Sequence, residues 1–132
     1  MSQGNVEVAT QAIEAFNRVD VDGFAGLTTA DFEWSPSMVA IEGTIFHGRE
    51  GIESYFRSLY NAWEKFHVHR DRFRAGDEVV VMLGRLEGRG SVSGVTVDSS
   101  LGMVFDFRDG AISRIRGFLD HAEALDAAGL AE

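Results

Sequence analysis

Asp120 is the first residue whose type and position suggest chemistry. It lies in RGFLDHAEALDAAG (116–129), where a strand pattern changes to a helix pattern. Its carboxylate can accept hydrogen bonds from the first helical turn, and Glu123 three residues later gives DHAE the form of a capping box. Strand alternation also places Asp120 on the same face as Phe118. If that face lines a cavity, the carboxylate can transfer protons, so both roles stay open.

Arg85 and Glu87 are the other candidates for acid/base chemistry. The strand period of two places them on one face together with Val81 and Leu83. If this face lines a cavity, the ion pair can orient a second carboxylate and separate the two pKa values, as an acid/base pair requires. The alternative is an exposed salt bridge near a turn, which contributes little to stability.

His67 and His69 share a strand face at a spacing of two, and Asp71 continues it. Two imidazoles and a carboxylate can bind zinc or iron. However, Phe66 and Val68 form an apolar opposite face, which indicates that the histidines face outward from a half-buried strand. No phosphate-binding glycine loop opens a helix in a βαβ unit. We therefore expect neither a metal nor a cofactor.

Composition limits the class of protein. The 132 residues carry a net charge of −9, include ten Phe and two Trp, and contain no Cys. This charge disfavours nucleic acid and anionic membranes as partners, and the aromatic content suits a small hydrophobic ligand. We expect one domain over 1–132. No signal-peptide pattern or membrane-length apolar run is visible, so we expect a cytoplasmic location.

Periodicity predicts helices first and strands later. Apolar spacing of three and four predicts a helix from Val6 to Val19, then a short helix capped by Asp20. ADFEWSPS predicts a short strand that Pro36 ends. The next helix lies within HGREGIESYFRSLYNAWEKF, where the apolar residues at helical spacing are Ile52, Tyr55, Phe56, Leu59 and Trp63.

The rest of the chain has the pattern of a sheet. FHVHRDRF, EVVVMLGRLEGRG, GVTVDSSLGMVFDFRDG and AISRIRGFLD are separated by turn sequences typical of antiparallel hairpins. A final helix is predicted from His121 to Ala128, with Gly129 as the residue that ends it. The fold class is therefore α+β, with helices packed on the concave face of a curved antiparallel sheet, cone-shaped around an internal pocket.

The order of FEWSP, GREGI, AGD, GRGS and LD..EAL.AAG along the chain resembles the SnoaL-like branch of the nuclear transport factor 2-like superfamily. The resemblance covers nearly the whole chain and implies this cone-shaped fold. It does not imply one activity, because the superfamily includes isomerases, cyclases, epoxide hydrolases, dehydratases and non-catalytic binders.

The isomerases and cyclases of this superfamily have catalytic groups that this chain lacks. At the positions similar to the ketosteroid isomerase base, oxyanion-hole tyrosine and protonated aspartate, it has Ser35, Ala12 and Met103. At the position similar to the acid/base aspartate of SnoaL-type cyclases, it has Gly117. The resemblance therefore argues against both reactions.

The epoxide hydrolases give a partial match. Their last-strand aspartate is similar to Asp120, and their Arg-x-Asp is similar to Arg85-Leu86-Glu87 if the next hairpin is one residue shorter. Trp34 and Pro36 replace the tyrosine and asparagine that position the water. Asp120, Arg85 and Glu87 are thus the predicted catalytic residues.

Two functional hypotheses follow. In the first, the chain binds a small hydrophobic or polycyclic molecule and performs cofactor-independent isomerase, cyclase or hydrolase chemistry. In the second, it is a non-catalytic homodimer that binds a small ligand. Aromatic side chains at these positions serve as core or as ligand contacts. The predicted ligand contacts are Phe16, Trp34, Tyr55, Phe56, Leu59, Leu101, Met103 and Phe118.

The homodimer prediction has two grounds. The family resemblance implies that two sheets pair face to face. In addition, strand alternation places apolar side chains such as Val104 and Ile115 on an outer sheet face that a monomer would leave in water. A cavity lined only by apolar side chains would favour the binding hypothesis over the catalytic one.

Overall fold

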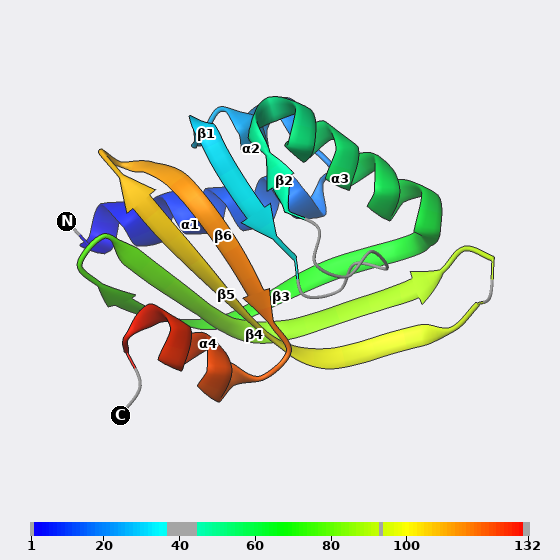
Figure 1. Ribbon diagram of the computed structural model, residues 1–132. Helices are drawn as coiled ribbons and strands as arrows, with labels where there is room; N and C mark the ends of the chain where they lie inside the picture. Colours follow the sequence, from blue (N-terminus) through cyan, green and yellow to red (C-terminus); the bar gives the residue numbers. More distant parts are fainter. Residues whose placement is uncertain (1, 37–44, 93, 131–132) are drawn as a thin grey trace.

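The computed structural model describes residues 2–36, 45–92 and 94–130 (Figure 1). Four helices and six strands follow one another in this part of the chain. They are α1 (Ser2–Asn17), α2 (Val21–Ala25), β1 (Thr28–Ser35), β2 (Phe46–His47), α3 (Gly48–Ala62), β3 (Trp63–Gly76), β4 (Val79–Gly90), β5 (Thr96–Arg108), β6 (Ala111–Phe118) and α4 (His121–Ala128).

All six strands form one curved sheet in the order β2-β1-β6-β5-β4-β3. The four long strands predicted from the sequence pair antiparallel as expected. The short strand β1 lies parallel to β6, and the still shorter β2 pairs with β1. The fold class is the expected α+β arrangement, and Figure 1 shows the strongly twisted sheet with α1 behind β5 and β6.

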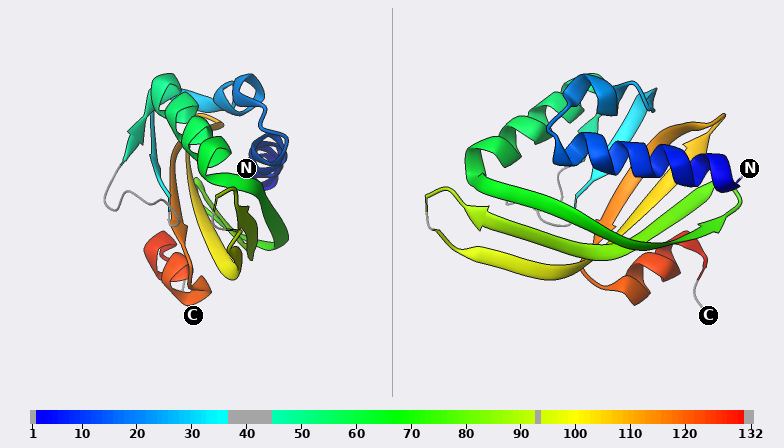
Figure 2. Two further views of the ribbon diagram at one scale, coloured as in Figure 1. Left: turned by 90° about the vertical axis from the view of Figure 1, so that its right-hand side faces the viewer. Right: turned by 180° about the vertical axis from the view of Figure 1, so that it is seen from behind.

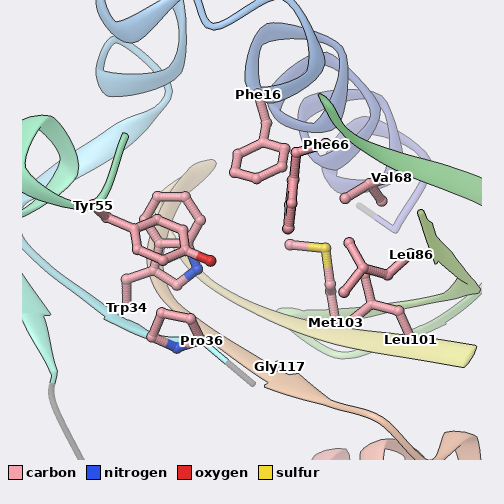
Figure 3. A pocket seen from close by; sticks show the side chains of 10 residues that line it. All are labelled: Phe16, Trp34, Pro36, Tyr55, Phe66, Val68, Leu86, Leu101, Met103 and Gly117. Atoms are coloured by element: carbon pink, nitrogen blue, oxygen red, sulfur yellow. The ribbon is translucent and has the colours of Figure 1, made fainter. Parts of the chain in front are cut away.

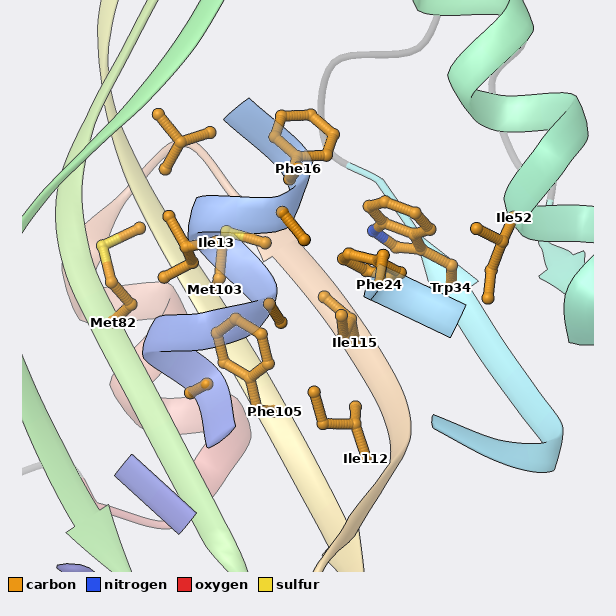
Figure 4. Close-up of a cluster of buried hydrophobic side chains, with 14 of the residues drawn as sticks. Ile13, Phe16, Phe24, Trp34, Ile52, Met82, Met103, Phe105, Ile112 and Ile115 are labelled. Carbon is orange, nitrogen blue, oxygen red and sulfur yellow. The ribbon is translucent and has the colours of Figure 1, made fainter. Parts of the chain in front are cut away.

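Helices α1, α2 and α3 cover the concave face of the sheet (Figure 2). Their buried side chains pack against alternate residues of the strands and form the main core. Figure 4 shows Ile13 and Phe16 of α1 above Met103 and Phe105 of β5. The amphipathic pattern of α1 predicted this contact with the sheet.

Helix α4 packs on the opposite, convex face (Figure 2). There Val81, Leu83 and Val104 form a second, smaller core with Ala124 of α4, and Phe118 packs against it. The expected cover of the concave face is thus provided by α1, α2 and α3, and the position of α4 on the convex face was not predicted. A short amphipathic helix buries its apolar side on whichever sheet face the preceding turn allows it to reach.

This placement also corrects the expected outer face. Val104 is fully buried, but α4 covers it. Ile115 pairs with Phe105 and belongs to the main core on the concave side. The two residues thus lie on opposite faces, and neither is left in water for a second sheet to cover.

The long helix ends earlier than its apolar spacing suggests. α3 stops at Ala62, and Trp63 is the first residue of β3. Trp63 has the extended backbone angles φ −125° and ψ 126°. Its helical spacing from Leu59 is therefore coincidental, and Trp63 lies on the edge strand. Of the helices in the described ranges, none has the length and apolar character needed to cross a membrane.

We expect Gly102→Ala to destabilise the protein. A Cβ atom at Gly102 would lie 2.5 Å from the Cβ of Ala124, so the change would force α4 away from β5. Overpacking of this kind costs roughly 1–3 kcal/mol of unfolding free energy, measurable by thermal or denaturant unfolding. Gly4→Ala is a control for an added Cβ that meets nothing within 4 Å, and because Gly4 lies in helix α1 this change should stabilise the protein slightly. Equal stability of the two variants would contradict the tight α4 contact.

Candidate functional site

A small cavity lies on the concave side of the sheet, below α1 and α3 (Figure 3). We call it the inner pocket. Its free space is about 30 Å³, which is room for about one or two water molecules. The lining residues are Phe16, Trp34, Pro36, Tyr55, Phe66, Val68, Leu86, Leu101, Met103 and Gly117.

Among the described residues of this lining, only the side chains of Trp34 and Tyr55 carry a nitrogen or oxygen atom. Their rings meet at 4.4 Å between centroids with an angle of 64°. In Figure 3 the Tyr55 hydroxyl and the Trp34 indole nitrogen both point towards the pocket. Within the described part of the chain, no hydrogen bond engages either group. The inner pocket is therefore apolar with one polar corner.

Burial raises the pKa of the Tyr55 hydroxyl, because a phenolate would be poorly solvated among apolar neighbours. The hydroxyl therefore stays protonated at neutral pH and can donate a hydrogen bond. The indole N–H of Trp34 is a donor only. Together they form a site for a hydrogen-bond acceptor of a ligand, such as a carbonyl oxygen.

Aromatic packing fixes the polar corner. Trp34 stacks on Phe24 of α2 with 4.8 Å between ring centroids and an angle of 11°. The rings of Phe16 and Trp34 meet edge to face, with 5.9 Å between their centroids. Trp34 is 3% and Tyr55 4% exposed, so neither ring can turn without disturbing the core.

Asn17 holds the pocket wall formed by the edge strand β3. Its side-chain amide donates to the carbonyl oxygen of Val68 and accepts from the backbone N–H of the same residue, both at 2.9 Å. These two bonds satisfy the backbone N–H and C=O groups of Val68 on the outer edge of β3, where no further strand of the sheet pairs. They fix the neighbouring residues Phe66 and Val68 against α1.

The predicted ligand contacts are partly placed in this pocket. Phe16, Trp34, Tyr55, Leu101 and Met103 line it. The other three do not. Phe56 is buried in the core, Leu59 lines a neighbouring cavity, and Phe118 packs on the convex face below α4. The expectation that Phe118 faces the pocket is wrong, because Gly117 occupies the inward position on β6.

The sequence reasoning missed Pro36, Phe66, Val68, Leu86 and Gly117 as pocket residues. Strand alternation indicates two of these five residues, because it places Phe66 and Val68 together on one apolar face of their strand. Leu86 is the apolar residue between Arg85 and Glu87, so its direction follows once the direction of these two charges is known.

Asp120 is the N-cap of α4 and lies outside the inner pocket. Its carboxylate accepts hydrogen bonds from the backbone N–H groups of Ala122 and Glu123 at 2.7 and 3.2 Å. The predicted cap is confirmed. The side chain is exposed, on the convex side of the sheet where α4 packs. The cavity and the carboxylate are thus on different sides of the sheet.

Arg85 and Glu87 also lie on the convex face, on the side of Val81 and Leu83. They do not pair with each other: Arg85 donates to Asp98 at 3.0 Å, and Glu87 contacts His69 at 2.8 Å. The hydrogen bond with His69 lowers the pKa of Glu87. A group that must hold a proton near neutral pH needs the opposite shift.

The two histidines face outward, as predicted. His67 and His69 lie with 4.5 Å between ring centroids on the convex side, while Val68 is buried on the other side. Partial burial, followed by the neighbouring His69, lowers the pKa of His67. In the ranges that the structure describes, no group of three or more His, Asp and Glu side chains has a metal-binding arrangement.

The SnoaL-like domain family matches residues 9–115, so the chain belongs to that family. No curated protein matches it. The resemblance inferred from the sequence motifs is therefore confirmed at the level of the family.

Solved structures with the same fold have low sequence identity. An NTF2-like protein of unknown function from Burkholderia pseudomallei is 22% identical, with coverage of 93% of this chain and 95% of that chain and a TM-score of 0.79. A polyketide cyclase candidate from Xanthomonas campestris pv. campestris is 20% identical, with coverages of 96% and 98% and a TM-score of 0.79. A ketosteroid isomerase-like protein from Catenulispora acidiphila, solved with trimethylamine, is 17% identical, with coverages of 94% and 93% and a TM-score of 0.77. These likenesses show the fold.

The positions that resemble catalytic residues of the relatives divide by face. Trp34, Pro36, Met103 and Gly117 line the inner pocket, and none of them carries an ionisable group. The charged residues Asp120, Arg85 and Glu87 lie on the convex side. The described lining of the inner pocket thus contains no carboxylate.

We expect substitutions at Asp120 to separate a capping role from a chemical one. Asp120→Ala removes the acceptor for two backbone N–H groups and should lower Tm by roughly 2–8 °C. Asp120→Asn should keep most of the stability, because asparagine caps helices about as well as aspartate. Thermal unfolding of both variants measures this difference. An Asp120→Ala variant as stable as the parent would disprove the capping role.

Proposed function

We propose that this protein binds a small, neutral ring molecule whose hydrogen-bond acceptor enters the inner pocket, the ring being accommodated by displacement of the aromatic side chains that line it, without acid/base catalysis by a carboxylate. The observation that carries the proposal is the pair of donors, Tyr55 hydroxyl and Trp34 N–H, in an otherwise apolar lining. Apolar walls with few convergent polar groups are typical of small-molecule sites.

The energetics favour an acceptor at this corner. The two donors line the pocket and have no hydrogen-bond partner among the described residues, so a ligand acceptor there gains hydrogen bonds worth about 0.5–1.5 kcal/mol each. A ligand carbonyl oxygen can accept from both at once, because it has two lone pairs. The rest of the ligand gains from the burial of apolar surface against Leu86, Leu101 and Met103.

The alternative hypothesis, acid/base chemistry by Asp120, Arg85 and Glu87, has less support. Their side chains lie on the convex face, and each is engaged there: Asp120 by the α4 backbone, Arg85 by Asp98 and Glu87 by His69. A ligand in the inner pocket cannot reach them across the sheet. The binding hypothesis requires none of these groups.

The relative from Catenulispora acidiphila was solved in complex with trimethylamine. That protein has the same fold and accommodates a small molecule. The precedent supports a binding role for the present chain without specifying its ligand, because the identity is 17%.

Acetophenone and ethylbenzene form a matched probe pair, because only the first has a carbonyl acceptor. We expect Tyr55→Phe to weaken acetophenone binding by roughly 2- to 10-fold, as the loss of one hydrogen bond predicts. Ethylbenzene binding should not change. Isothermal titration or tryptophan fluorescence can measure both affinities. Equal effects on the two probes would refute the polar corner, and no binding of either probe would refute the proposed function.

The homodimer remains a prediction that rests on the family resemblance. The argument from an apolar outer face does not hold, because Val104 and Ile115 are both buried within the chain. The outer face beyond α4 instead carries charged pairs such as Arg85–Asp98. A sheet-to-sheet dimer would have to match these charges across the interface. Light scattering at micromolar concentration should give a dimer mass, and a monomer mass would contradict the prediction.

A further inference from the structure

A second cavity adjoins the inner pocket between the C-terminal parts of α1 and α3 and the start of β3. We call it the outer chamber. Its free space is about 250 Å³, far more than the 30 Å³ of the inner pocket. Aromatic rings dominate its walls, among them Phe56, Tyr60 and Trp63. Tyr60 is 75% exposed, so the chamber opens to solvent on this side.

Phe16 and Phe66 line both cavities and therefore stand between them. Their rings meet edge to face, with 5.6 Å between centroids and an angle of 71°. Figure 3 shows the two rings next to each other at the α1 side of the inner pocket. The small volume of the inner pocket thus depends on the position of these two side chains.

The two rings are held to different degrees. Phe16 is 8% exposed and contacts the rings of Trp34, Tyr55 and Phe56 in addition to Phe66. Phe66 is half-buried on the edge strand β3, and its ring contacts within the described residues are with Phe16 and Trp63. A rotation of Phe66 therefore disturbs fewer contacts than a rotation of Phe16.

We propose that the outer chamber is the entrance to the inner pocket and that the Phe66 ring is the gate between them, admitting flat neutral ring molecules. This inference rests on the proposed function of the inner pocket and adds the route of access. Rotation of Phe66 joins the two cavities, whereas Phe16 serves as the fixed side of the opening.

The walls of the chamber select for the class of ligand. Aromatic faces favour flat ring molecules through stacking and edge contacts. Glu64 lies at the chamber and the chain has a net charge of −9, so an anion is repelled. The amide of Asn17 is already engaged by Val68, and the remaining side-chain polar groups of the described lining are the Tyr60 hydroxyl and the Trp63 indole N–H. A neutral ring molecule fits these surroundings best.

The two tryptophans of the chain allow a direct test, because Trp34 lines the inner pocket and Trp63 the outer chamber. Trp63→Phe leaves the inner reporter and Trp34→Phe leaves the outer one. Nitrobenzene serves as the probe, since it is flat, neutral and quenches indole fluorescence on contact. Stopped-flow mixing then gives the rate at which the probe reaches each cavity.

With Phe66 present, we expect fast quenching of Trp63 and slower quenching of Trp34. Phe66→Ala should raise both the association and dissociation rates at Trp34 by about tenfold, the effect of roughly 1.4 kcal/mol less barrier. Kd should change less than either rate, which distinguishes a gate from a simple enlargement of the pocket. Phe73→Ala is the matched control, because Phe73 is also a half-buried phenylalanine of β3 that packs on the core.

The outcomes separate the two proposals. Saturable quenching of Trp34 with the same rates in Phe66→Ala and Phe73→Ala would overturn the gate and leave the proposed function standing. Absence of saturable quenching at Trp34 in every variant would overturn both. If thermal unfolding shows that Phe66→Ala is not folded, Phe66→Leu replaces it, with the same direction of change and a smaller amplitude expected.

Discussion

The need to bury both faces of β4 and β5 governs this structure. From Val79 to Leu83 every residue of β4 is buried, because the main core lies on one side and α4 on the other. Strands covered on both faces have continuous apolar runs, whereas strands with one wet face alternate. Without α4, Val81, Leu83 and Val104 would face water. The C-terminal helix is thus a structural requirement of the sheet.

This constraint assigns each remaining residue to a side. Beyond the reach of α4 the convex face carries charged and polar side chains, among them Arg85, Glu87 and Asp98, while the residues between them face the helices on the concave side. Because side chains alternate along a strand, the neighbours Leu86 and Glu87 face opposite sides of the sheet, and so do Gly117 and Phe118. The strand residues that line the inner pocket face the concave side of the sheet. The predicted catalytic residues with charged side chains face the convex side.

The sequence therefore predicted the helices and strands better than it predicted which face of the sheet each side chain occupies. Local signals were sufficient for α4, where Asp120 and Gly129 bound the helix as expected, and Gly129 has the left-handed φ of 74°. They were not sufficient to show which side of the sheet α4 covers, because that depends on contacts distant in sequence. The run VVVML did carry this information, since five consecutive apolar residues exceed the need of a sheet covered on one face.

The site was predictable to the same extent. Phe16, Trp34, Tyr55, Leu101 and Met103 were expected at the pocket from type and family position, and they line it. Trp63 was assigned to the long helix because its spacing from Leu59 is helical. The change from helix to strand at Ala62 follows instead from the pairing of β3 with β4, which no local pattern specifies.

The same aromatic residues form the core and the wall of the cavity, which limits how the protein can use the space. Phe16 contacts Trp34, Tyr55, Phe56 and Phe66, so the packing around the inner pocket is continuous with the packing of the helices. A void in such a core lowers stability. Under the proposed function, a ligand that fills part of this void and accepts from Tyr55 and Trp34 binds the folded state alone, so ligand binding would raise the stability of the protein.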